Sequence, residues 1–174
     1  MAKGDTFILR TTVDSSGVNY VSSDIDISAY TDPARGKVLV VDRGFITFST
    51  DGNGPLIPAD IVGSGTGGVE MGTQVCTETQ TDLVSASDNS LFMLNNLYAT
   101  VGTAGMITFL NEQSAMNPAQ FKGGFIVPTD KIHCGAKTGG AWNNEIRMGF
   151  VFEVHTEKLS LSKIQELLVS LTAN

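Results

Sequence analysis

The sequence is poor in the side chains that carry enzyme chemistry, with only two histidines and two cysteines among its 174 residues. A metal-dependent enzyme needs several His and carboxylate ligands that converge on one ion. Strand alternation places His133 and His155 on outer faces, where we expect surface imidazoles. The sequence therefore argues against a metalloenzyme, and we expect neither a metal nor another cofactor.

The motifs of other enzyme classes are also missing. Asp24 and Asp26 share a strand face, as do Glu153 and Glu157, but any acidic strand face gives such pairs, so they do not indicate a glycosidase. The glycine-rich run 63–68 has neither a GK[ST] ending nor a helix pattern after it, which favours a flexible or interface loop over a phosphate loop. No Gly-x-Ser-x-Gly nucleophile motif occurs. We therefore expect no catalytic residues and a protein that is not an enzyme.

Two cysteines are too few for a disulfide scaffold, and their spacing matches no zinc motif. Alternation around Val75 places Cys76 on a polar or interfacial face, whereas Cys134 shares a face with Ile132 and is expected inside. We expect two free thiols. An intramolecular bridge and an intersubunit bridge through Cys76 are the alternatives.

Basic residues are scarce, because 11 Lys and Arg stand against 18 Asp and Glu and give a net charge of −7 without any basic cluster. Neutralising phosphates requires concentrated Lys and Arg, so we expect no direct nucleic-acid partner. The charged fraction of 17% suggests that polar surface faces neighbouring subunits. No secretory signal and no bilayer-spanning stretch is visible, so we expect synthesis and folding in a cytoplasm.

The sequence is rich in short β patterns separated by turn residues, which is typical of an all-β sandwich or barrel in one domain, residues 1–174. A single straight strand over residues 37–50 would be too long, so we expect a bulge near Gly44 and burial of residues 38–41 on both faces. Residues 91–101 also fit a helix, but we favour a strand. The candidate strands are residues 6–13, 18–28, 37–50, 69–79, 91–100, 105–110, 121–127, 131–136 and 145–158.

The last strand leads into a short amphipathic helix over about residues 160–172, capped by Ser160 or Ser162. We expect its apolar stripe to pack against the sandwich, with a neighbouring subunit or a membrane surface as alternatives. Together with Cys76, the residues that we predict to make packing or interface contacts are those of the stripe, Ile164, Leu167, Leu168 and Leu171.

Two loops carry candidate ligand-binding residues. Asp51, Asn53 and Asp60 lie in or near a glycine loop and are oxygen ligands of the kind that calcium prefers, although the spacing fails at the later positions of an EF-hand. An ordinary turn is the simpler interpretation. Trp142 lies beside glycines and is interpreted as a loop anchor, with a sugar platform as the alternative.

The order of features in the second half of the chain resembles that of a known family. The sequence FIVPTDKIH at residues 125–133 is followed by a glycine-containing loop around Trp142, a strand over 147–157 and a helix that begins KLSLS. Over residues 37–172 this is similar to the single jelly-roll major capsid proteins of icosahedral double-stranded DNA viruses of archaea and bacteria with an internal membrane. The resemblance implies an eight-stranded jelly-roll β-sandwich that self-assembles through lateral contacts into capsomers.

The resemblance also implies partners and a location. The partners would be copies of the same chain, a second capsid protein, a penton protein and an internal membrane, in a virion assembled in the host cytoplasm. The lack of a basic arm suits a shell that is separated from its genome. Two other functions stay open for this chain, a carbohydrate- or receptor-binding β-sandwich such as a spike or fibre head, and a decoration protein of a tailed virus.

Overall fold

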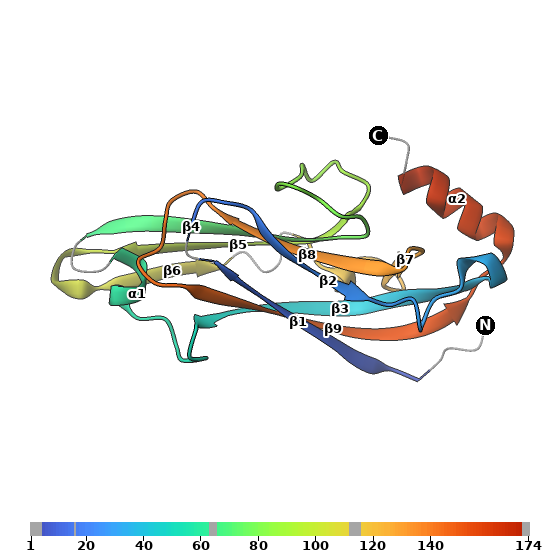
Figure 1. Cartoon of the computed structure of the whole chain (residues 1–174), viewed down its shortest axis with the longest axis horizontal. Coiled ribbons are helices and arrows are strands. Elements are labelled where there is room, and N and C mark those ends of the chain that lie inside the picture. Colours follow the sequence, from blue (N-terminus) through green and yellow to red (C-terminus); the bar gives the residue numbers. More distant parts are fainter. Residues whose placement is uncertain (1–4, 16, 63–65, 112–115, 172–174) are drawn as a thin grey trace.

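The computed structural model describes residues 5–15, 17–62, 66–111 and 116–171, which form a sandwich of two antiparallel β-sheets (Figure 1). A short helix, α2, follows the last strand and ends the described chain. The elements are β1 (Phe7–Ser15), β2 (Val21–Asp26), η1 (Pro33–Arg35), β3 (Lys37–Thr50), α1 (Pro58–Val62), β4 (Gly67–Cys76), β5 (Leu91–Val101), η2 (Thr103–Gly105), β6 (Ile107–Asn111), η3 (Pro118–Gln120), β7 (Phe125–Val127), β8 (Lys131–Thr138), β9 (Ile146–Lys158) and α2 (Leu161–Leu171).

The strand pairs are nested along the chain. β1 pairs with β9, β2 with β8, β3 with β7 and β4 with β5, all antiparallel. One sheet has the order β1-β9-β3-β7 and the other has the order β2-β8-β4-β5-β6. This is the path of one long hairpin wrapped around a barrel axis, which defines a jelly roll. Eight strands make the nested pattern as expected, and β6 extends the five-stranded sheet by one strand.

The strand predictions are confirmed in type and order, including β5 over the ambiguous residues 91–101. β3 spans the whole predicted range, and its pairing with β9 shifts register between Val41 and Arg43. The expected bulge near Gly44 therefore lies slightly earlier. Residues 38–41 are all fully buried, as expected of a segment covered on both faces. Helix α1 has no sequence signal because five residues are too short to show helical periodicity.

The core lies between the two sheets and is built from alternate residues of each strand. Phe150 and Phe152 of β9 and Phe92 of β5 are among its largest fully buried side chains. Burying side chains of this size stabilises the fold by about 2 to 3 kcal/mol each relative to exposure. The core therefore holds the two sheets together without disulfides, and both cysteines are free.

The two long edges of the sandwich differ. At one edge β1 and β2 lie against each other, and the hydroxyl groups of Thr11 and Ser23 are 2.9 Å apart. At the other edge β6 is the last described strand of its sheet, while β7 pairs with β3 only over Leu39–Val41. The rest of β3 has no described strand on that side. One edge is thus closed and the other is open.

Helix α2 starts where the sequence predicts. The backbone N–H of Lys163 donates to the Ser160 hydroxyl at 3.4 Å, so Ser160 is the cap of the two candidates. Asn89 donates to the Ser170 carbonyl at 2.7 Å and ties the other end of α2 to the sandwich. No helix in the described parts of the chain is long and apolar enough to cross a membrane.

A polar side chain in the core lacks hydrogen-bond partners. Asn95 of β5 is fully buried, and neither its side-chain oxygen nor its side-chain nitrogen has a hydrogen-bond partner among the described residues. A buried amide without partners costs about 1 to 3 kcal/mol. We expect Asn95→Val to raise the free energy of unfolding by about 1 kcal/mol or more, measured by urea titration.

The matched control is Thr73→Val on the neighbouring strand. The Thr73 hydroxyl donates to the backbone carbonyl of Asn95 at 2.7 Å, so removal of this hydroxyl should lower the free energy of unfolding by about 1 kcal/mol. Equal losses in both variants would contradict this account of Asn95.

Candidate functional site

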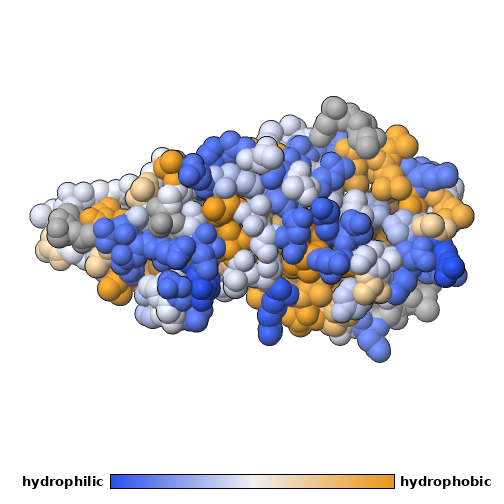
Figure 2. Space-filling view, viewed as in Figure 1, coloured by the Kyte–Doolittle hydropathy of each residue, from blue (hydrophilic) through white to orange (hydrophobic). Residues whose placement is uncertain are grey.

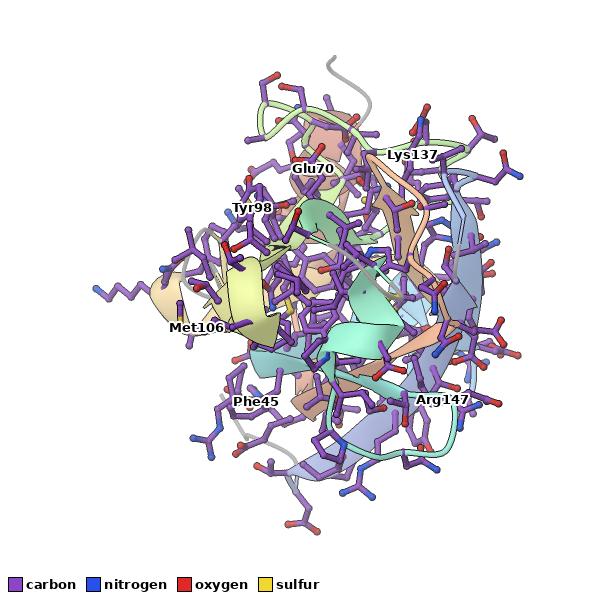
Figure 3. All side chains as sticks on the ribbon, turned by 90° about the vertical axis from the view of Figure 1, so that its left-hand side faces the viewer. Phe45, Glu70, Tyr98, Met106, Lys137 and Arg147 are labelled. Carbon is purple, nitrogen blue, oxygen red and sulfur yellow. The ribbon has the colours of Figure 1, made fainter. Side chains whose placement is uncertain are left out.

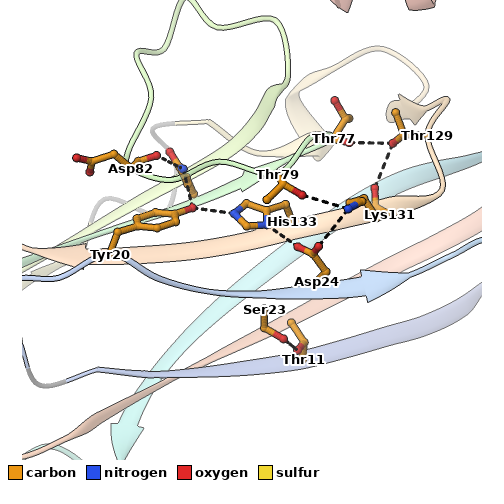
Figure 4. A network of polar contacts seen from close by, with 11 residues as sticks. Thr11, Tyr20, Ser23, Asp24, Thr77, Thr79, Asp82, Thr129, Lys131 and His133 are labelled. Carbon is orange, nitrogen blue, oxygen red and sulfur yellow. Dashed lines mark hydrogen bonds and ion pairs between the residues drawn. The ribbon is translucent and has the colours of Figure 1, made fainter.

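A network of polar side chains lies on the outer face of the five-stranded sheet, around His133 of β8 (Figure 4). His133 is only 1% exposed. Its Nδ1 is 2.5 Å from a carboxylate oxygen of Asp24, and its Nε2 is 3.0 Å from the Tyr20 hydroxyl. The outer face was correctly predicted, but the expectation of a surface imidazole is wrong, because Tyr20 and the loop after β4 cover it.

The covering loop consists of residues 77–90 and is held by Gln74 of β4. The Gln74 amide nitrogen donates to the Asp82 carbonyl at 2.9 Å and to the Tyr20 hydroxyl at 3.0 Å, while its oxygen accepts from the Val84 N–H at 2.8 Å. The Tyr20 hydroxyl thus lies between the Gln74 amide and Nε2 of His133, and Nδ1 of His133 faces the Asp24 carboxylate. Both ring nitrogens of the buried imidazole therefore have a hydrogen-bond partner.

Burial and hydrogen bonding change the acidities in this network. Burial raises the pKa of Tyr20 to about 12, and the hydrogen bond from Gln74 offsets only part of this effect. Burial also acts to raise the pKa of Asp24, but hydrogen bonds and charge interactions with His133 and Lys131 outweigh it and leave that pKa below its ordinary value. The Asp24 carboxylate therefore stabilises the folded state while it is ionised.

We expect Asp24→Asn to lower the free energy of unfolding by about 1 kcal/mol at pH 7. Since the folded pKa is depressed, the stabilisation by Asp24 is complete above the unfolded pKa of about 4 and is lost as pH falls through the folded value. Urea unfolding between pH 7 and pH 2 should show the wild type and the variant converging in acid. Asp5→Asn, which alters an exposed carboxylate, should show a smaller difference at pH 7, and a constant offset at all pH values for Asp24→Asn would contradict the prediction.

The two cysteines lie on opposite faces of adjacent strands. Cys134 pairs with Val75 and belongs to the core, as expected, whereas Cys76 pairs with His133 on the outer face. Cys76 thus lies on the predicted polar face, but it is fully buried because the covering loop closes over it. Burial raises the pKa of its thiol to about 12, which leaves little thiolate for disulfide exchange.

The calcium candidates Asp51 and Asn53 bind a protein side chain, the Arg147 guanidinium. Asp51 and Asn53 each place a side-chain oxygen near the Arg147 guanidinium, at 3.1 and 3.3 Å, and Asp14 binds the same guanidinium through both carboxylate oxygens. The hydrogen bond to Asp14 is the main cause that raises the pKa of Arg147. A cation is thus already present between these oxygens. Figure 3 shows Arg147 near the closed edge, away from Phe45 and Met106.

Asp60 acts apart from this cluster. Its carboxylate is buried, accepts from the Ile57 N–H at 2.9 Å and accepts from the Asn144 amide at 2.9 Å. These bonds join α1 to the loop between β8 and β9. Among the described residues, no group of three or more His, Cys, Asp or Glu is arranged to hold a metal ion.

The remaining candidates for enzyme chemistry are structural. His155 is buried and its Nδ1 is 2.7 Å from an Asp42 carboxylate oxygen, so the expected surface position is again wrong. Asp42 lies at the β3 bulge, which turns it toward β9. Glu153 forms an ion pair with Arg43, and Asp26 accepts from the Ser28 N–H. None of these carboxylates lines any of the cavities described below.

Two loops complete the account of the sequence candidates. Trp142 is 3% exposed and belongs to the core, which agrees with a loop anchor and leaves no free ring face for a sugar platform. Residues 63–65 of the glycine-rich run lie outside the described residues.

The open edge carries a group of exposed apolar side chains, named here the apolar edge and consisting of Phe45, Met106, Phe109 and Leu110. Met106 is 71% exposed and Leu110 57%. Figure 3 shows Phe45 of β3 and Met106, which directly precedes β6 of the other sheet, on the same side of the sandwich. Next to them the Asn117 amide donates to the Gly44 carbonyl at 2.8 Å and so satisfies part of the β3 edge. Exposed large apolar groups along a sheet edge are typical of an interaction surface.

The predicted apolar stripe of α2 is buried unevenly. Ile164 is buried, Leu167 and Leu171 are half-buried, and Leu168 is 38% exposed. Leu167 and Leu171 line an apolar cavity of about 250 Å³ together with residues around β7, including Phe125. Figure 2 shows hydrophobic side chains at the surface over α2. The stripe thus packs against its own domain mainly through Ile164.

Sequence reasoning missed Tyr20, Gln74 and the residues of the covering loop. Each is an ordinary polar residue without a motif, and only the register of β4 and β8 brings them together. Gly135 is the one local signal, because a side chain there would collide with the ring of Tyr20.

No family model and no curated protein matches the chain. Among solved structures the chain is similar to the unassembled KI polyomavirus VP1 pentamer, with 10% identity, a TM-score of 0.46 and coverage of 89% of this chain and 95% of that chain. It is also similar to the human polyomavirus 6 VP1 pentamer, with 9% identity, a TM-score of 0.39 and coverage of 91% and 97%. For the structure of turnip yellow mosaic virus the identity is 10% and the TM-score is 0.31, with coverage of 90% of this chain and 96% of that chain. These scores are too low to transfer a function, so the class of this protein, a jelly-roll β-sandwich, follows from its own strand order.

Proposed function

We propose that the protein is a structural subunit of a viral capsid and that it assembles with copies of itself through the edges of its jelly roll. Jelly rolls occur in viral capsid proteins, in lectins and in metal-dependent cupins, so the fold alone does not choose among them. The cupin alternative lacks support, because the buried histidines are each engaged by a single carboxylate within the described structure.

The apolar edge is the observation that carries this proposal. Phe45 of β3, Met106 just before β6, and Phe109 and Leu110 of β6 are exposed apolar side chains of the segments that border this edge. β6 is also the last described strand of its sheet, so its outer backbone groups have no strand partner there. Monomeric proteins protect such an edge with charge, proline or a covering segment. A second copy of the chain would bury both the side chains and the strand edge.

The finer features of this proposal come from the resemblance in the second half of the chain. They are a single jelly-roll major capsid protein of an icosahedral double-stranded DNA virus with an internal membrane, a location in the virion after assembly in the host cytoplasm, and contacts with a second capsid protein and a penton protein. The absence of a basic cluster from the sequence supports a shell that does not bind its genome directly.

Size-exclusion chromatography with light scattering, followed by negative-stain imaging over a range of protein and salt concentrations, tests the proposal. We expect regular rings, sheets or shells whose amount grows with protein concentration. A protein that stays monomeric under all of these conditions would overturn self-assembly.

A further inference from the structure

The outer face of the five-stranded sheet holds a second feature beside the covering loop, an open depression. Three of its residues, Glu70, Tyr98 and Lys137, are labelled in Figure 3. Two adjoining concave surfaces of about 270 and 380 Å³ share Glu70, Tyr98 and Gly139. Strand register explains why they meet, since Glu70 of β4 pairs with Tyr98 of β5 and its carbonyl accepts from the Gly139 N–H. Two residues further along β4, Gly72 pairs with Asn96 of β5 on one side and with Lys137 of β8 on the other.

Two glycines allow neighbouring side chains to lie close to the sheet around the depression. A Cβ atom at Gly72 would lie 2.7 Å from a methyl group of Leu83, and one at Gly139 would collide with the Glu70 carboxylate. Leu83 belongs to the covering loop and forms one wall. The side chains of Leu83 and Glu70 therefore lie directly on the glycine backbone, which leaves the space between Tyr98 and Lys137 for a ligand.

The charges of the depression favour an uncharged ligand. Glu70 makes no hydrogen bond or ion pair within the described residues, so its carboxylate remains an available acceptor. The Lys137 ammonium lies 2.7 and 2.8 Å from the two carboxylate oxygens of Asp82, which balance its charge. A phosphate or an acidic sugar would face the uncompensated charge of Glu70, whereas hydroxyl groups would donate to it and accept from Lys137.

Tyr98 supplies the apolar part of the site. The Tyr98 side chain is 37% exposed to solvent and lines both concave surfaces. In one of them it lies beside the amide of Asn96. An exposed ring next to a carboxylate, an amide and an ammonium suits a ligand with an apolar C–H face and a rim of hydroxyls. We propose that this depression binds a neutral saccharide, with the pyranose ring on Tyr98 and its hydroxyls on Glu70, Asn96 and Lys137. Tyr98 pairs with Leu110 of the apolar edge, so the depression borders the proposed assembly surface, and the proposal concerns the unassembled subunit.

Saturation-transfer NMR on the purified protein tests the proposal with glucose, galactose, mannose, N-acetylglucosamine and lactose as probes and N-acetylneuraminic acid as the acidic comparison. We expect at least one neutral sugar to bind with a Kd of about 1 mM, which corresponds to about 4 kcal/mol. Tyr98→Ala should weaken that binding at least tenfold, while Glu70→Gln, which keeps an acceptor, should weaken it less than tenfold.

Tyr30→Ala is the matched control, because Tyr30 is 38% exposed but packs on Phe7, away from the depression. It should leave sugar binding unchanged, and thermal unfolding should show that every variant is folded. Binding of none of the neutral sugars, binding that survives Tyr98→Ala, or binding of the acidic sugar alone would overturn the proposal. None of these results would change the outcome of the assembly experiment.

Discussion

The double variant Met106→Asp/Leu110→Asp is expected to remain a folded monomer and to form no rings or shells. Both side chains are mostly exposed in the subunit, so the change should alter the free energy of unfolding by no more than about 0.5 kcal/mol per site. At an interface, each aspartate would place an unpaired charge where an apolar contact is needed, which costs several kcal/mol. Light scattering and negative-stain imaging at the wild-type assembly concentration measure the effect.

Val18→Asp is the matched control for this experiment. Val18 is also half exposed, but it lies in the loop between β1 and β2 at the closed edge. This variant adds one negative charge, where the double variant adds two, and it should assemble as the wild type does. Assembly of the double variant at wild-type yield would exclude the apolar edge as the contact surface, and equal loss in both variants would point to charge repulsion instead.

Helix α2 gives the second large effect. Ile164→Asp should lower the free energy of unfolding by about 3 kcal/mol, because it places a charge in the buried seat of the helix. Leu168→Asp, on the same predicted stripe but 38% exposed, should lower it by less than about 1 kcal/mol. Urea unfolding of both variants provides the comparison.

The pair also separates folding from assembly. If Leu168→Asp is as stable as the wild type but assembles poorly, α2 also contacts a neighbouring subunit, which is the alternative that the sequence left open. If Ile164→Asp costs no stability, α2 does not pack on its own domain as described.

The sequence by itself determined the strands, their order and the terminal helix, and it narrowed the cap of that helix to Ser160 or Ser162. These features depend on neighbouring residues, because alternation reports a half-buried strand and the period of 3.6 reports a helix with one apolar face. The β3 segment shows how far this reaches, since its length alone predicts a bulge within a few residues of the observed register shift. The pairing of strands far apart in sequence is not local, and the jelly roll came from resemblance until the nested pairs were observed.

Tertiary structure alone decided which outer faces are buried. Alternation placed His133, His155 and Cys76 correctly on the outer faces of the sheets, yet all three are covered, two of them by groups brought in by the loop after β4 and by Tyr20. Alternation distinguishes the two faces of a strand but gives no information on what a distant segment lays over them. Tertiary structure also decided that Tyr98, Glu70 and Gly139 lie side by side. The register between neighbouring strands is set by packing across the sheet and not by any one strand.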